Sequence, residues 1–141
     1  VTNRMPVAEN IDDARRTTID LMKAHPDMKG IVSFGSQGPI GAGRAVKEKR
    51  AKGKVFVYGM MIPSQAASLI KSGDIAMGIT YDPASAGYAI TAIADKVLKG
   101  EEITQGLEIP NLGKADVDSE KRIIKFHKVL RVTKENIDSL Y

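Results

Sequence analysis

Short apolar runs alternate with amphipathic segments along most of the chain. Three runs, at residues 30–35, 54–60 and 75–81, are too short for helices, which is typical of buried strands. Apolar residues at helical spacing precede the first run and follow each of the three. This order predicts an α/β fold of the Rossmann-like, three-layer kind. Its parallel sheet is flanked by helices on both faces and joined by right-handed crossovers.

Start and stop signals bound the predicted helices. Asn10 is a good N-cap for the first, and a proline stands at the start of each of the others. Gly73 and Gly100 follow the third and fourth helices, where a C-terminal glycine belongs. The apolar residues of the fourth helix lie on one stripe of its surface. The four helices are predicted at residues 11–25, 39–53, 63–71 and 83–99.

The pattern changes after Gly100. Residues 101–120 contain glycines, a proline and scattered carboxylates, which predicts a loop-rich connection with one short strand at residues 106–110. Alternating apolar residues at 124–132 predict a strand or hairpin, and a last short helix is expected at 134–140. At the other end, Val1 and Thr2 resemble the tail of a strand. The opening strand–helix unit of a doubly wound domain is therefore expected to be absent from this sequence.

Composition narrows the function classes. The 141 residues are 43% hydrophobic and 27% charged, which is typical of one globular domain. The absence of cysteine excludes disulfides, thiolate nucleophiles and cysteine metal sites, and only two histidines are present. We expect no catalytic residue, metal or cofactor. The net charge of +4 is concentrated in a basic cluster, interpreted as a solvated helix face and not as a nucleic-acid footprint: Arg44, Lys47, Lys49, Arg50, Lys52 and Lys54.

Ligands of open α/β sheets bind beyond the carboxyl ends of the strands, so candidate site residues are sought there. The first strand-end loop, GSQGPIGAGRA, has glycines spaced nearly as in a phosphate loop, but Arg44 and Ala45 replace the required Lys and Ser or Thr. Its small residues either let a backbone approach a ligand or let a helix pack tightly on the sheet. Ser36 and Ser64 lack the setting of a nucleophile, which argues against acyl transfer.

Tyr81 and Asp82 end the third strand and begin the fourth helix. An aromatic ring that stacks on a sugar face, beside a carboxylate that accepts hydroxyl protons, is a common way to hold a small polyol. The alternative is that Tyr81 belongs to the core and Asp82 only caps the helix.

Three segments carry a resemblance to a known family: DMKGIVSFGSQGPIGAGRAV, KVFVYGMMIPSQAASLIKSGDIAMGITYDPASAGYAITAIADKVLKGEEI and VLRVTKENIDSLY. They resemble the C-terminal half of type I periplasmic solute-binding proteins of bacterial sugar ABC importers. Within that group, the aromatic-Asp-Pro start of the fourth helix and the Val-Thr-Lys-Glu-Asn tail resemble the branch that binds autoinducer-2 or rhamnose.

The resemblance implies a two-lobed clamp that holds a sugar-sized ligand without catalysis. Ribose-type members carry Asn-Asp where this chain has Gly35 and Ser36, and Asp where it has Met61, which argues against a plain ribose site. Phe34 and Ser36 match loop positions that touch the ligand in the autoinducer-2 branch. The candidate ligand-binding residues are Phe34, Gly35, Ser36, Gln37, Met61, Tyr81 and Asp82.

On this resemblance, residues 1–82 are part of the C-terminal lobe, residues 83–128 pack on the other lobe, and residues 129–141 are the return strand and terminal helix. The expected partners are a small sugar or polyol, an ABC permease and the missing N-terminal lobe, and no nucleic acid. The chain is then a fragment of a longer periplasmic or secreted protein. The first alternative function is the effector-sensing domain of a sugar-responsive repressor. The second alternative is a small α/β enzyme that acts on a phosphorylated substrate.

Overall fold

The structure, a computed structural model, describes residues 3–141. The chain divides into two compact units. The first is Val1–Thr80 with Arg131–Tyr141, and the second is Tyr81–Leu130. Each is described separately below.

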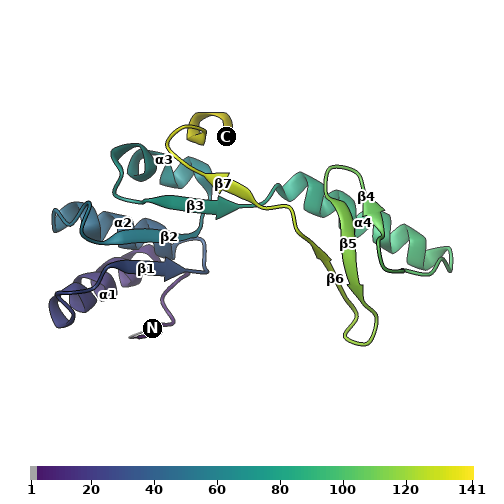
Figure 1. Ribbon diagram of the computed structural model, residues 1–141, viewed down its shortest axis with the longest axis horizontal. Helices are drawn as coiled ribbons and strands as arrows, with labels where there is room; N and C mark the ends of the chain where they lie inside the picture. Colours follow the sequence, from purple (N-terminus) through teal and green to yellow (C-terminus); the bar gives the residue numbers. More distant parts are fainter. Residues whose placement is uncertain (1–2) are drawn as a thin grey trace. The chain divides into compact units, whose positions relative to one another are not determined.

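The first unit is built on a four-stranded sheet with the order β1-β2-β3-β7 (Figure 1). Strands β1, β2 and β3 are parallel, with Val32 opposite Tyr58 and Tyr58 opposite Met77. The chain leaves this sheet after β3 and returns to it as β7. Its elements are α1 (Ile11–Ala24), β1 (Gly30–Ser33), α2 (Gly38–Glu48), β2 (Phe56–Met60), α3 (Pro63–Ser72), β3 (Met77–Thr80), β7 (Leu130–Val132) and the 3-10 helix η1 (Ile137–Ser139).

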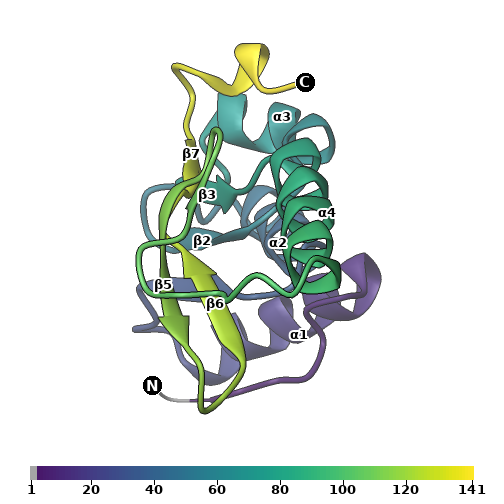
Figure 2. The ribbon, with the colours of Figure 1, turned by 90° about the vertical axis from the view of Figure 1, so that its right-hand side faces the viewer.

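The predicted parallel sheet flanked by helices is confirmed, but its helices lie on one face only. Figure 2 shows α1, α2 and α3 on the same side of the strands. For α2 and α3 the reason is topological, because β1, β2 and β3 follow one another in the same direction across the sheet. Right-handed crossovers that step in one direction place their helices on one face. The expected third layer is not formed by the described residues of this unit.

The opposite face of the sheet carries exposed apolar side chains. Val32 of β1, Phe56 and Tyr58 of β2, and Ile79 of β3 are all exposed. They alternate with buried or partly buried residues along each strand, as one face of a pleated sheet requires. The sequence of these strands is therefore apolar on both faces, as in a strand buried on both sides.

The core of this unit lies between the sheet and its helices. Ile40 and Val46 of α2, Val57 of β2 and Ile70 of α3 are buried there. Val132 of β7 joins the same cluster, as does Ile137 of η1. The return of the chain after β6 therefore completes the core.

Local signals set the helix ends as predicted. The Asn10 side chain accepts a hydrogen bond from the backbone N–H of Asp13, which caps α1. Gly73 ends α3 with a φ of 76°, in the left-handed region that favours glycine. The helix predicted at 39–53 is shorter than expected, because α2 ends at Glu48 and Arg50 already has a positive φ.

The second unit pairs a helix with a small antiparallel sheet of order β4-β5-β6. Its elements are α4 (Pro83–Leu98), β4 (Glu108–Ile109), β5 (Gly113–Asp118) and β6 (Ile123–Phe126). The short strand predicted at residues 106–110 is confirmed as β4, but the prediction that the rest of residues 101–120 is a loop-rich connection was wrong, because β5 lies within it. Ala115 pairs with Phe126 and Val117 with Ile124, so apolar residues oppose one another across the two strands.

Two further predictions near the C-terminus were wrong. The segment 124–132 is neither one strand nor a hairpin: β6 belongs to the small sheet and β7 to the large one. The helix predicted at 134–140 is only a 3-10 turn, η1. Asn136 accounts for this local structure, because its side-chain oxygen accepts from the Thr133 N–H at 2.8 Å while its amide donates to the Arg131 carbonyl.

Most of the apolar stripe of α4 is exposed. Only Ser85 and Ala89 of this helix are buried. Ile90, Val97 and Leu98 are exposed, Leu98 to 87%. An apolar stripe at helical spacing normally faces a core, so this face of α4 is unpartnered among the described residues.

Candidate functional site

The candidate site lies at the carboxyl ends of the parallel strands. Helices α2 and α3 begin within a few residues of β1 and β2, each with a proline at its first turn. A proline at that position costs no hydrogen bond, since the first N–H groups of a helix have no partner inside it. The strand-end loops are therefore short, and their side chains stay at the edge of the sheet.

The loop after β1 presents an aromatic ring. Phe34 follows the last residue of β1 and its side chain is 84% exposed. Gly35 is buried, while Ser36 and Gln37 are partly exposed. A ring this exposed contributes nothing to the core, so Phe34 is available to a ligand.

Hydrogen bonds tie this loop to two neighbouring segments. The Gln37 amide donates to the Gln65 side-chain oxygen at 3.3 Å, which links the loop after β1 to the start of α3. The Ser36 hydroxyl donates to Oε2 of Glu9 at 3.3 Å. Sequence reasoning did not select Gln65 or Glu9. Gln65 lies in a segment that follows a strand end, so the sequence could have indicated it. Glu9 precedes α1 and lies at this edge only because of the tertiary fold.

Met61, a predicted ligand-binding residue, is 1% exposed. It lies against Gly78 of β3, where a Cβ atom would come within 2.6 Å of the Met61 methyl carbon. The thioether therefore fills the space that a side chain at position 78 would occupy. In this unit Met61 is a core residue.

Asp82 caps helix α4. Its carboxylate accepts from the N–H of Ala84 at 3.1 Å and of Ser85 at 3.2 Å, and also from the Ser85 hydroxyl. The Ser85 hydroxyl, with further help from these N–H groups, lowers the pKa of Asp82 below its ordinary value. Of the two interpretations left open by the sequence, the N-cap is the one the geometry shows.

Tyr81 is 54% exposed, so it is not the core residue that the alternative interpretation required. It directly follows β3, at the first residue of the second unit. That Tyr81 and Asp82 share one site with Phe34 stays a prediction.

The glycine-rich loop serves packing. A Cβ atom at Gly41 would meet the Ile11 carbonyl and lie 2.9 Å from the Arg15 nitrogen, so this glycine lets α2 approach α1. A Cβ atom at Gly43 would lie 2.6 Å from Ile75. Both glycines are covered by the chain itself, which favours the packing interpretation over a phosphate-binding one.

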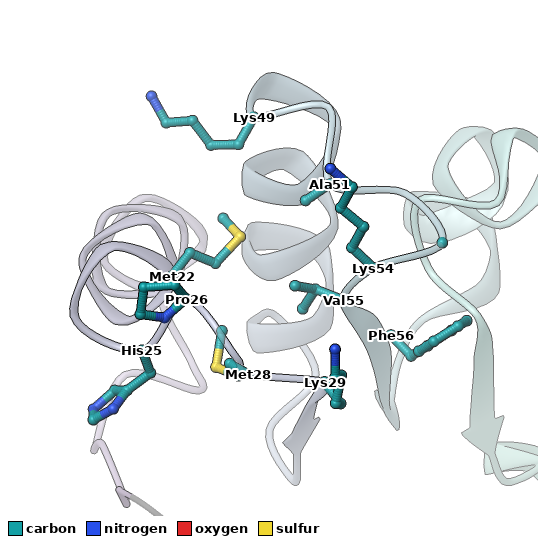
Figure 3. A pocket seen from close by; sticks show the side chains of 11 residues that line it. Met22, His25, Pro26, Met28, Lys29, Lys49, Ala51, Lys54, Val55 and Phe56 are labelled. Carbon is teal, nitrogen blue, oxygen red and sulfur yellow. The ribbon is translucent and has the colours of Figure 1, made fainter.

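A cavity of about 470 Å³ lies at the opposite edge, near the amino ends of β1 and β2. Met22 and Met28 are among the residues that line it, and Figure 3 shows the His25 and Lys49 side chains pointing away from them. The amino ends of parallel strands are not where open α/β sheets bind ligands, so this cavity is separate from the candidate site. A second cavity of about 470 Å³ lies within the second unit, lined by Asp82, Ala84, Ser85, Tyr88, Pro110 and Asn111.

The acidic residues of the second unit form no metal site. Asp116 accepts from Gln105 at 3.0 Å and pairs with His127 at 2.7 Å, and His127 holds the pKa of this carboxyl below its ordinary value. Asp118 binds Lys121. Among the described residues no three His, Asp or Glu side chains gather as metal ligands.

Fold and site together define an α/β protein with hydrogen-bonding and aromatic groups at its strand ends. The chain belongs to the periplasmic binding protein family, because the family model described as "Periplasmic binding protein domain" matches residues 1–102. The ribose import binding protein of Salmonella typhimurium is 32% identical over 84 residues, which is 60% of this chain and 28% of that protein.

Solved structures share the fold. LsrB from Clostridium saccharobutylicum in complex with AI-2 matches with a TM-score of 0.72 at 18% identity, over 92% of this chain and 45% of that one. An ABC transporter solute-binding protein from Clostridium phytofermentas with bound L-rhamnose matches with a TM-score of 0.75 at 17% identity. That match covers 93% of this chain and 45% of the other. The chain thus spans less than half the length of the proteins that it matches. Across residues 3–141, every helix is too short or too polar to cross a membrane.

Proposed function

We propose that this chain is part of a two-lobed clamp, with residues 1–82 in its C-terminal lobe, that binds a small neutral sugar or polyol and delivers it to the permease of a bacterial ABC importer, without catalysis. The observation that carries the proposal is at the carboxyl edge of the first unit, where the loop after β1 exposes the Phe34 ring and where Gln37 bonds to Ser36 and to Gln65, all uncharged groups. The family match and the ribose-binding relative support it.

The residues at this edge suit the two faces of a sugar. A pyranose ring has an apolar C–H face that stacks on an aromatic side chain, and hydroxyls that bond to amides and hydroxyl groups. Phe34 supplies the first kind of contact, and Gln37 and Gln65 supply the second. Gly35 keeps the loop backbone close to residues 8 and 9, so that the Phe34 ring and the Ser36 hydroxyl stay at the edge.

Within sugars, we propose a deoxy sugar of the rhamnose type or autoinducer-2. By resemblance, ribose-type members have Asp at position 61, where this chain has a buried Met61. Loss of that carboxylate and the exposure of Phe34 both favour a ligand with more apolar surface than ribose.

The second unit fits the clamp arrangement. We propose that residues 83–128 pack on the other lobe and that residues 129–141 return to the first. The exposed apolar stripe of α4, with Ile90, Val97 and Leu98, supports this because a packed lobe would bury it. The corresponding location is the periplasm or the cell exterior, and the partners are the permease and the second lobe.

Thermal unfolding of the native gene product that contains this chain tests the proposal. A ligand at 100 times its Kd adds about 2.7 kcal/mol of stability. We expect a rise in Tm with one or more of L-rhamnose, autoinducer-2, D-ribose and D-arabinose. A rise only with inorganic phosphate or sugar phosphates contradicts the proposal and favours the enzyme alternative.

A further inference from the structure

We propose that Glu9 is the carboxylate that accepts the hydroxyl protons of the bound sugar. This inference rests on the proposed function. The residue expected to fill this role, Asp82, already accepts three hydrogen bonds at the start of α4. The lone pairs of Asp82 are directed at Ala84 and Ser85. If the sugar hydroxyls are bound by a charged carboxylate, another residue must supply it.

Backbone hydrogen bonds fix Glu9 at the carboxyl edge of the sheet. The carbonyl of its neighbour Ala8 accepts from the N–H of Gln37 at 3.2 Å and of Gly38 at 2.7 Å. These are N–H groups at the start of α2, which have no partner inside that helix. The segment before α1 is thereby attached to the loop after β1.

Gly35 makes this approach of the two segments feasible. A Cβ atom at position 35 would lie 2.5 Å from both the Ala8 carbonyl oxygen and Oε1 of Glu9. Real Cβ atoms do not approach other atoms so closely, so a larger residue would collide with the Ala8 carbonyl and displace the carboxylate. The glycine in the loop after β1 therefore lets the segment of Ala8 and Glu9 lie against this loop.

The carboxylate of Glu9 is open to a ligand. It is exposed, and its one hydrogen bond within the described residues is the 3.3 Å contact from Ser36 to Oε2. No cation pairs with it among residues 3–141. A carboxylate has about four acceptor sites, so two vicinal hydroxyls of a sugar can donate to the remaining ones.

The charge at this edge selects for neutral ligands. Asp12 in the first turn of α1 adds negative charge close in sequence to Glu9, whereas the neighbouring Asp13 is paired with Arg16. Neither arginine of that helix pairs with Glu9, because Arg15 binds Glu48 and Arg16 binds Asp13. An anionic sugar would meet repulsion here, so the site should discriminate a free sugar from its phosphate.

Titration calorimetry of the native gene product and of Glu9→Gln tests the inference, with L-rhamnose, D-ribose, D-arabinose, autoinducer-2 and D-ribose 5-phosphate as probes. Glu→Gln keeps the shape of the side chain and removes its charge. For any neutral sugar that the wild type binds, we expect Kd to rise at least tenfold in Glu9→Gln. We expect the preference for D-ribose over its 5-phosphate to shrink, and the Tm without ligand to stay within 1 °C.

Glu102→Gln is the matched control, because Glu102 is also exposed and lies outside the site. Its Kd should stay within twofold of the wild type. If the wild type binds a neutral sugar and Glu9→Gln binds it within twofold, the role of Glu9 is overturned while the proposed function stands. If the wild type binds neither autoinducer-2 nor any of the three neutral sugars, the proposed function and the role of Glu9 are overturned together.

Discussion

Gly41 of α2 lies against the carbonyl group of Ile11 in α1, with no room for a Cβ atom between them. The Ala14 Cβ atom and the Arg15 backbone nitrogen close the same space. Two helices that meet at a glycine can approach more closely than helices that meet at larger residues. This contact keeps α1 and the segment before it, which carries Glu9, in place.

Gly41→Ala should therefore destabilise the first unit. The neighbouring atoms at this position include backbone, which cannot rotate away, so we expect a loss of about 1–3 kcal/mol in the free energy of unfolding. Gly87→Ala is the matched control: it is also helical, but a Cβ atom there meets nothing within 4 Å. That control should be neutral or gain about 0.5–1 kcal/mol. Urea denaturation of the two variants measures the difference, and equal effects would refute the role of Gly41 in packing.

Asp82→Ala should loosen α4, because the carboxylate that caps its first turn is lost. We expect a Tm lower by about 2–5 °C, whereas Asp82→Ser, which keeps a capping oxygen, should recover most of it. Amide hydrogen exchange at Ala84 and Ser85 should rise in the alanine variant only. Unchanged exchange there would contradict the cap.

The same carboxylate gives a pH dependence of known sign. The pKa of Asp82 is lowered in the folded state, first by the Ser85 hydroxyl and then by the N–H groups of Ala84 and Ser85. A lowered folded pKa means that the stabilisation is present above the unfolded pKa of about 3.9 and is lost as the pH falls through the folded value. Ser85→Ala should raise the pKa of Asp82, as carbon-detected NMR titration of the carboxyl group can measure. A pKa unchanged by Ser85→Ala would show that the hydroxyl is not the main cause.

Phe34→Ala separates ligand binding from stability. Because the ring is 84% exposed, its removal should change the free energy of unfolding by less than about 0.5 kcal/mol. Loss of the stacking surface should weaken sugar binding at least tenfold in fluorescence-based thermal-shift titrations. A variant that keeps its affinity would remove Phe34 from the site.

Met61 should show the opposite behaviour. Met61→Ala removes a fully buried side chain that covers Gly78, with an expected loss of about 2–5 kcal/mol. Met61→Leu conserves volume and should cost less than about 1.5 kcal/mol while leaving the sugar affinity within twofold. If Met61→Leu weakened the affinity strongly without a loss of stability, Met61 would be a ligand contact after all.

Local chemistry accounts for the parts of the fold that were predictable. Prolines at helix starts, the Asn10 cap and Gly73 each act within a few residues, so the alternation of strands and helices followed from the sequence. The packing of the helices on only one face of the sheet could not be predicted from the sequence, because it depends on the order of the strands in space. Strand β5 was missed because Lys114, Asp116 and Asp118 occupy one of its faces, and a run of charges resembles a loop.

The candidate site was predictable where it follows a strand end. Phe34, Ser36 and Gln37 were selected on that rule, and the structure places them at the edge of the sheet. Glu9 could not be selected, because it reaches that edge only through the contact of Ala8 with the start of α2. Met61 was selected because it lies in a strand-end loop. Its side chain points into the core instead, because Gly78 has no side chain and leaves the space that Met61 fills.

The most direct measurement is the calorimetric titration of the native gene product with L-rhamnose and autoinducer-2. If the chain belongs to a clamp for a deoxy sugar of the rhamnose type or autoinducer-2, at least one of these neutral ligands should bind saturably, with one ligand for each protein molecule. Heat changes with neither of them, but saturable binding of phosphate or a nucleotide, would contradict the account and show that this fold serves another chemistry here.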